Sequence, residues 1–342
     1  MSATTQLTDF NDLFTDLSNR VRIQTGITAT QNQSQRYINI ALHDLVVGFA
    51  EKLPWLEKRS EILTHAPYST GTVSVALATR TTVTGVDTLW NTAVTGMGFN
   101  NARTTGKMTL SGGTDIFRVT AIASDTSLTI TPRFVGDTAL SGASYVYFED
   151  EYALASDFLR PIDFTLYIDN FQVPIVSRKE FVRAYPRPNV SGRPRVACII
   201  DLPPSGDTVP IRRLQVYPYP NAVYVMNYRY ISSNLVIGSD GTEKAQFTAN
   251  ADEPKLPLRY RHALVFHALS HWYRDKKDDA RSQEAKAEYT DLMLRLVGDN
   301  EIGTANVVQI QPRPGLYTRK ANRPYSGGGR FSINDSFDRF QS

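Results

Sequence analysis

The sequence predicts an α+β protein in which helices from both ends of the chain form a helical bundle body around an inserted β module. The prediction rests on helical patterns near both ends, a threonine- and glycine-rich block between them, and a last stretch without regular pattern. The predicted parts are N-terminal helices (1–59), an inserted antiparallel β barrel or sandwich (60–148), β-hairpins with a long C-terminal helix (149–297), and an extended C-terminal arm (298–342).

The composition excludes several classes of protein. With 342 residues the chain exceeds the size at which a single core stops growing, about 250–300 residues. The net charge of +3 gives no strong field of the kind that marks a nucleic-acid binder. Cys198 is the single cysteine and lies in an apolar run, so we expect a buried thiol and no disulfide. Without a signal peptide or membrane-spanning run, the sequence predicts a protein of a reducing, cytosol-like compartment.

The N-terminal segment predicts a pair of helices. Asp9 can cap the first helix, whose apolar residues recur at spacings of three and four from Phe10 to Val21. Gly26 should end it. The second helix should start at Thr30 or Asn32 and carry a broad apolar stripe as far as Phe49, so neighbours must cover it on more than one side.

The block from 60 to 148 has the pattern of a small antiparallel β structure. Short alternating runs such as 72–77 and 127–131 are separated by glycines and other turn residues. Helical patterns flank this block in the sequence, which indicates a module inserted into the rest of the protein.

After the module, local signals predict a return link, a hairpin and a short helix. Glu149-Asp150-Glu151 is interpreted as a solvated turn, and 164–168 with 172–176 as a β-hairpin. Ser177 should cap a helix over 178–185.

A second hairpin and a long helix are expected next. The runs 214–220 and 223–230 predict strand, tight turn and strand. A helix should then open after Pro257 and continue without a break to Leu296. Its polar middle is either solvent-exposed or a subunit contact, and the candidate interface residues are Arg274, Lys276, Asp279, Arg281 and Glu284.

The last segment, 298–342, cannot bury enough apolar surface to fold alone. It nevertheless keeps aromatic residues among arginines, the residue types enriched at interfaces, so we expect a docking arm rather than a passive tail. The candidate partner-binding residues are Arg313, Tyr317, Arg319, Lys320, Arg323, Tyr325, Arg330, Phe331, Phe337 and Phe340.

The chain offers little that points to catalysis, and we expect neither enzyme activity nor a cofactor. His267 and His271 lie one helical turn apart, as metal ligands can, but a metalloprotease glutamate and an obvious third ligand are missing. Packing or a subunit contact is therefore the favoured interpretation. Gly106-Lys107 fails the phosphate-loop pattern, and the acidic run 149–151 is a weak candidate for glycosidase carboxylates.

The arrangement resembles the head-to-tail adaptor proteins of tailed bacteriophages, also called connector or head completion ring proteins. The motifs that carry the resemblance are the return link Asp150-Glu151-Tyr152-Ala153-Leu154-Ala155-Ser156-Asp157-Phe158, the proline-tyrosine run 214–220 with 228–230, and Leu256-Pro257 before the helix at 263–272. The 71–148 block is similar to β modules of many phage structural proteins.

The resemblance implies a dodecameric homo-oligomeric ring in the virion neck, made in the cytoplasm of the host bacterium. Such a ring would bind the portal protein above and a tail or nozzle protein below, while double-stranded DNA passes through its channel. An alternative is a tail-tip or fibre-attachment protein that uses the β module to contact tail fibres. A virion-associated cell-wall hydrolase is a weaker alternative.

Overall fold

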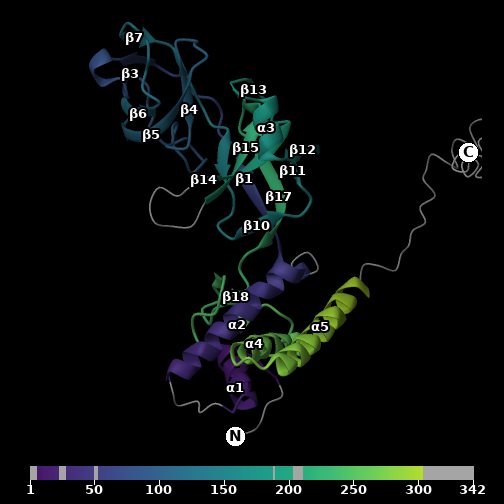
Figure 1. Ribbon diagram of the computed structural model, residues 1–342. Helices are drawn as coiled ribbons and strands as arrows, with labels where there is room; N and C mark the ends of the chain where they lie inside the picture. The colour runs from purple at the N-terminus through teal and green to yellow at the C-terminus, as the bar shows by residue number, and fades with distance from the viewer. Residues whose placement is uncertain (1–5, 23–27, 50–52, 188, 203–210, 303–342) are drawn as a thin grey trace, which may run out of the picture.

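The computed structural model describes residues 6–22, 28–49, 53–187, 189–202 and 211–302. Figure 1 shows a helical part at one end, a mixed β-sheet in the middle and a β module at the other end. The chain passes from the helical part through the middle sheet into the module, and then returns the same way.

The helical part combines elements from both ends of the chain. It comprises α1 (Phe10–Arg20), α2 (Thr28–Phe49), α4 (His262–Asp275) and α5 (Asp279–Ile302). The predicted cap is confirmed, because the Asp9 side chain accepts a hydrogen bond from the backbone N–H of Asp12 at 2.8 Å. However, α1 ends earlier and α2 begins earlier than expected.

One apolar cluster holds these helices together. Members that are at most 3% exposed include Phe10, Leu13, Leu17, Ile38, Ala41, Leu42, Leu45, Leu53, Leu56, Ala263, Leu264, Val265, Ala268, Met293 and Leu296. The same cluster takes in Phe247, whose ring is stacked on that of Phe10 with 4.5 Å between centroids. The cluster joins residues of α1 and α2 with residues of α4 and α5, so the core of the helical part forms only when these distant segments pack together.

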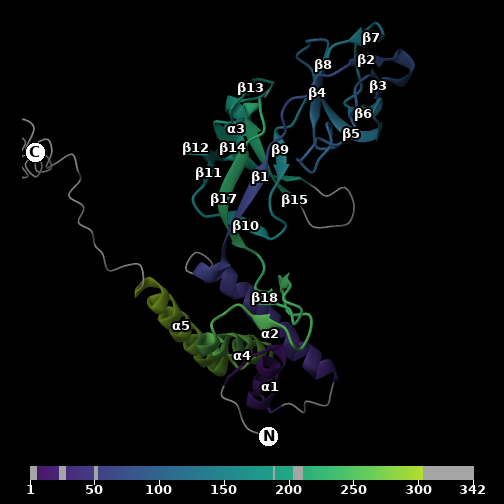
Figure 2. The same ribbon diagram turned by 180° about the vertical axis from the view of Figure 1, so that it is seen from behind.

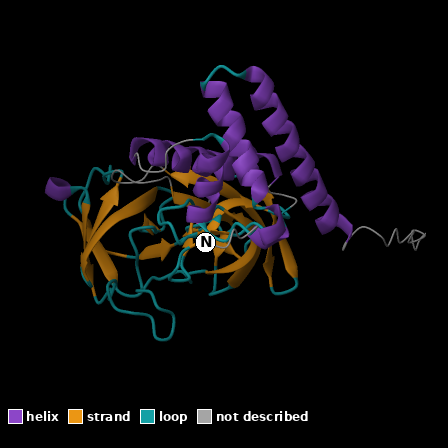
Figure 3. Cartoon of the chain, turned by 90° about the horizontal axis from the view of Figure 1, so that it is seen from below, coloured by secondary structure: helices purple, strands orange, loops and turns teal. Residues whose placement is uncertain are grey.

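The prediction of one unbroken C-terminal helix is wrong. The chain reverses between Asp275 and Asp279, and Figure 3 shows the resulting helices side by side, joined by a short loop. Lys277 has a positive φ of 60°, a left-handed conformation that ends a helix. The hydroxyl of Ser282 donates to the carbonyl of Ser270 at 2.8 Å, which holds α5 against α4.

The middle sheet is built from strands that are distant in sequence. Its order is β1-β17-β11-β12-β14-β15-β9, with β10 also on β17, and β12 and β14 run parallel. The sheet stands between the helices and the module in both Figure 1 and Figure 2. Its strands are β1 (Glu57–Leu63), β9 (Glu151–Ala153), β10 (Phe158–Pro161), β11 (Thr165–Ile168), β12 (Phe171–Val176), β14 (Val196–Leu202), β15 (Ile211–Tyr217) and β17 (Val225–Ser232).

Local predictions in this region have mixed outcomes. The hairpin of β11 and β12 is confirmed, and so is the helix capped by Ser177, α3 (Arg178–Ala184). The predicted hairpin of 214–230 is wrong, since β15 pairs with β14 and β9 whereas β17 pairs with β1, β10 and β11. The chain between them instead forms β16 (Tyr219–Pro220), which pairs with β13 (Ser191–Gly192).

The β module has its own antiparallel sheet, ordered β7-β2-β3-β6-β5-β4-β8. A separate core surrounds Trp90, which is fully buried and donates through Nε1 to the hydroxyl of Tyr145 at 3.0 Å. The predicted boundary between 59 and 60 falls inside β1, a strand of the middle sheet. The module strands are β2 (Thr72–Val75), β3 (Thr82–Val86), β4 (Lys107–Leu110), β5 (Ile116–Ser124), β6 (Ser127–Thr131), β7 (Leu140–Ala143) and β8 (Tyr145–Phe148).

A loop with little regular structure links the middle sheet back to the helices. Asp252 organises it, since its buried carboxylate accepts from the backbone N–H groups of Thr248 and Ala249, both at 2.8 Å. The short elements here are β18 (Val236–Ile237), β19 (Glu243–Lys244), β20 (Glu253–Pro254) and the 3-10 turn η4 (Leu258–Tyr260); further 3-10 turns are η2 (Pro54–Leu56) and η3 (Leu77–Thr79).

Candidate functional site

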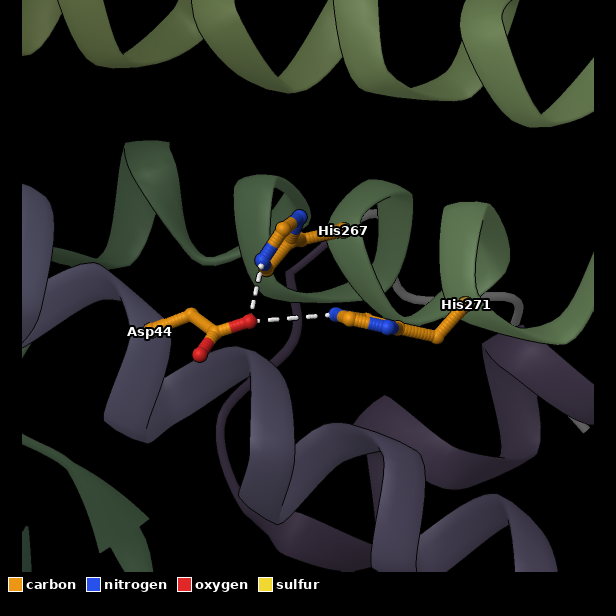
Figure 4. A group of neighbouring side chains, drawn as sticks. All are labelled: Asp44, His267 and His271. Atoms are coloured by element: carbon orange, nitrogen blue, oxygen red, sulfur yellow. Dashed lines mark hydrogen bonds and ion pairs between the residues drawn. The ribbon is translucent and has the colours of Figure 1, made fainter. Parts of the chain in front are cut away.

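A histidine pair on α4 meets a carboxylate from α2. His267 and His271 are one turn apart, so both rings leave the same face of the helix. Figure 4 shows them converging on Asp44, whose Oδ2 lies 3.0 Å from Nε2 of His267 and 3.1 Å from Nε2 of His271. The ligand-type atoms of the cluster all lie within 4.8 Å of one another.

The surroundings of His267 favour the neutral imidazole. The residue is only 8% exposed, and its ring is stacked on that of Tyr289 from α5 with 4.3 Å between centroids. Burial lowers the pKa of His267 below its usual value, although the hydrogen bond to Asp44 acts in the opposite direction. Burial also raises the pKa of Tyr289 to about 12. The cluster therefore joins α2, α4 and α5 through an uncharged ring at neutral pH.

A hydrogen bond defines the tautomer of His271. Nη2 of Arg274 lies 2.6 Å from Nδ1 of His271, and because a guanidinium only donates, Nδ1 must accept. The proton of His271 is then on Nε2, from which it is donated to Asp44. The carboxylate of Asp44 is 46% exposed, so the cluster opens to solvent on this side.

The cluster supplies the third ligand-type group that the sequence did not reveal for the histidine pair. The histidine spacing was visible, but the third group comes from a position 223 residues away from His267. Nothing in the local sequence around Asp44 marks it as a partner, since it is one more polar residue on the outer side of an apolar helix.

The candidate interface residues surround the α4–α5 turn, and all are exposed: Arg274, Lys276, Asp279, Arg281 and Glu284. Lys276 and Arg281 lie over the rings of Trp272 and Tyr273, at 5.2 Å and 5.8 Å from the centroids. The surface of the turn thus carries charges of both signs, and two of its cations pack on aromatic rings. Whether another subunit covers it stays a prediction.

The candidate arm residues lie outside the part of the chain that the structure describes. They are Arg313, Tyr317, Arg319, Lys320, Arg323, Tyr325, Arg330, Phe331, Phe337 and Phe340. Their role in partner binding stays a prediction.

The interpretation of the acidic run as a solvated turn is wrong. Glu149, Asp150 and Glu151 are at most 7% exposed. Glu149 forms an ion pair with Arg103, and Lys107 lies 2.8 Å from Asp150 and 2.7 Å from Glu151. Burial alone would lower the pKa of Lys107, but these carboxylates outweigh it and raise the pKa. The run joins the module to the middle sheet.

The rejected phosphate-loop pattern also has a structural explanation. A Cβ at Gly106 would overlap the ring of Tyr147, so glycine is required there for packing. Lys107 lies in β4 and is engaged by carboxylates rather than being free for a phosphate.

Comparison with known proteins places the chain in a family. Within the described residues, no helix combines the length and apolar character needed to cross a membrane. A search of curated proteins found no match. Residues 8–310, which include the helical part, the middle sheet and the inserted module, match the family described as SU10 adaptor protein. The chain therefore belongs to the SU10 adaptor protein family and is a structural adaptor of a bacteriophage.

Proposed function

We propose that this adaptor is a non-enzymatic virion protein that forms a ring beneath the portal, joins the DNA-filled head to the tail and continues the DNA channel. The observation that carries the proposal is the family match over residues 8–310, because it spans both the helices and the inserted module. The subunits would form a homo-oligomeric ring, with twelve copies as the expected number, in the neck of the virion.

The exposed charges at the α4–α5 turn support a lateral contact between subunits. Arg281 and Glu284 have opposite signs and lie close together on one exposed segment of α5. In a ring, each subunit offers one surface to the neighbour on one side and a different surface to the other. Mixed charge suits such a contact because it sets orientation and suppresses wrong pairings.

The weak net charge supports a channel through which DNA slides. Each Lys or Arg that neutralises a phosphate strengthens binding by releasing counterions. A chain with a net charge of only +3 has no excess of such groups to retain the DNA.

The partner-binding role is assigned to the arm, 298–342. Its aromatic and arginine residues would dock on the portal protein, and the opposite side of the ring would receive a tail or nozzle protein. Most of the arm lies beyond the residues that match the family, which end at 310. An arm that binds one particular portal protein would differ among family members, and its position outside the family match agrees with that.

The test uses the full chain and a version truncated after Ile302, both mixed with purified portal rings. We expect the full chain to co-sediment with portals and to appear in negative stain as a ring attached to them. The truncated chain should keep its circular dichroism spectrum and melting temperature but lose portal binding. Normal portal binding by the truncated chain would refute the arm, and the absence of any portal complex with the full chain would refute the portal-adaptor role.

A second function is favoured by the separate position of the β module. It lies at the end of the molecule farthest from the helices and has its own core (Figure 1). A module held out in this way could dock a tail fibre, as in a tail-tip or fibre-attachment protein. Trimers in negative stain, together with capture of fibre protein by the module, would favour this role over the portal ring.

A further inference from the structure

We propose that Asp44, His267 and His271 form a binding site for a divalent transition metal, with Zn²⁺ as the expected ion. The site would join α2 to α4. Imidazole nitrogens with a carboxylate oxygen are a common ligand set for zinc, and two histidines separated by one helical turn are a recurring way to supply it.

The distances fit a tetrahedral ion. Donor atoms at 2.0–2.1 Å from one zinc ion lie about 3.3 Å apart when the angles are tetrahedral. Oδ2 of Asp44 is 3.0 Å from Nε2 of His267 and 3.1 Å from Nε2 of His271. Each Nε2 is therefore only a few tenths of an ångström from its ideal distance to Oδ2. The ligand atoms of the whole cluster lie within 4.8 Å of one another, so the two imidazoles would have to approach each other by up to about 1.5 Å to bind one ion. The side chain of Asp44 is 46% exposed, so water could supply a fourth ligand.

The position of the His267 ring also fits. The ring is buried and stacked on that of Tyr289 with 4.3 Å between centroids, and its Nε2 lies 3.0 Å from Oδ2 of Asp44. Metal binding to this ring would connect α2 and α4 directly, and α5 through Tyr289.

A variant of Arg274 can test whether the cluster binds a metal or only forms hydrogen bonds to Asp44. It donates to Nδ1 of His271 and so fixes the proton on Nε2, the atom that a metal would need. Zinc binding moves that proton to Nδ1, so Arg274 must leave, which is feasible because its side chain is exposed. Arg274 thus competes with the metal, and removing its guanidinium should strengthen zinc binding.

The experiment uses the full chain after treatment with EDTA and dialysis. Zinc is titrated against a chromophoric chelator, Co²⁺ serves as a spectroscopic substitute, and thermal melting is followed with and without zinc. We expect about one Zn²⁺ per chain, intense visible absorption of Co²⁺ of the kind that tetrahedral coordination gives, and a higher melting temperature with zinc.

The variants separate a built site from binding to surface histidines. His271→Ala and Asp44→Asn should weaken zinc binding by at least about 100-fold and abolish the melting shift, since each removes a ligand. His43→Ala removes an exposed imidazole next to Asp44 in the sequence. It should change neither the zinc affinity nor the shift of the melting temperature. Arg274→Gln should bind zinc about tenfold more tightly.

Any one of three results would overturn the proposal. These are no stoichiometric zinc on the wild type, equal affinity of the wild type and His271→Ala, or loss of binding in His43→Ala. Each variant is first compared with the wild type by circular dichroism without metal. If Asp44→Asn or His271→Ala is unfolded, zinc binding by Arg274→Gln that is no tighter than that of the wild type overturns the proposal instead.

Discussion

Lys107 in β4 of the module lies 2.8 Å from Asp150, at the point where the chain leaves the module for the middle sheet. The carboxylate is fully buried, and its Oδ2 also accepts from Nε2 of Gln215 in β15 at 3.0 Å. The Asp150 carboxylate thus accepts hydrogen bonds from the β module and from the middle sheet, and so it links the two.

Removing the Lys107 ammonium group beside Asp150 should lower the stability of the protein. Lys107→Met leaves Asp150 as an uncompensated buried charge, so the free energy of unfolding should fall by about 3–5 kcal/mol in urea denaturation. Lys179→Met, on the exposed surface of α3, is the control and should change it by less than about 0.5 kcal/mol. The double variant Lys107→Met/Asp150→Asn should recover part of the loss. A loss below about 1 kcal/mol in the single variant would contradict the prediction.

Asp157 should make the stability sensitive to acid. Burial would raise its pKa, but hydrogen bonds from Lys58, Tyr230 and Ser232 outweigh that and lower the pKa from 3.8 to about 2. A carboxyl group with a lowered pKa stabilises the fold above its unfolded pKa, and this contribution is lost as the pH falls through the folded value. Asp252, with a pKa lowered to about 2, adds to the same trend.

The measurement is urea denaturation of the wild type and Asp157→Asn at pH 6 and pH 3. The wild type should lose about 1 kcal/mol more than the variant on going to pH 3, because Asn does not titrate. Asp169→Asn, whose side chain is 84% exposed, should behave like the wild type. Parallel pH profiles for the wild type and Asp157→Asn would exclude this role.

The β module should fold alone as residues 66–148. Its core consists of its own residues around Trp90, and the module retains its own strand pairings. Trp90 is then the only tryptophan present, so its fluorescence reports on that core. We expect a cooperative urea transition with emission shifted to the blue in the folded state.

A matched variant tests whether the isolated fragment has the native core. Tyr145→Phe removes the hydrogen bond to Nε1 of Trp90 and should lower the free energy of unfolding of the fragment by about 1–3 kcal/mol. Gradual unfolding, or no effect of Tyr145→Phe, would show that the module depends on the middle sheet.

Charge reversal at the α4–α5 turn should impair assembly and leave folding intact. Arg281→Glu and Glu284→Lys change exposed residues, so each melting temperature should stay close to the wild type. If the turn contacts a neighbouring subunit, self-association in analytical ultracentrifugation should weaken by about tenfold or more, since like charges oppose each other across an interface. Lys179→Glu is the control, and unchanged association of both variants would locate the interface elsewhere.

The sequence predicted those features that short-range chemistry determines. The caps Asp9 and Ser177 and the tight hairpin of β11 and β12 each depend on residues a few positions apart. The strand patterns at 214–217 and 225–230 were also recognised, but their partners were not, because pairing with β9 or β1 depends on distant segments.

Two side-chain clusters met the same limit, because their partners are distant in the sequence. An acidic run such as 149–151 usually faces water, and only the fold shows that it is buried against Arg103 and Lys107. The histidine pair on α4 was found from its spacing, but Asp44 had no local signal. Long-range contacts decide both cases, and a single sequence does not display them.

The bridge between Tyr68 and Tyr147 has an evolutionary consequence. Their backbones exchange hydrogen bonds of 2.8 Å, so the segments that lead into and out of the β module lie side by side. An insertion whose ends are adjacent hardly disturbs its host, which is why such positions tolerate whole domains. Recombination could therefore exchange this β module for another of unrelated sequence and leave the middle sheet and the helical part of the adaptor unchanged.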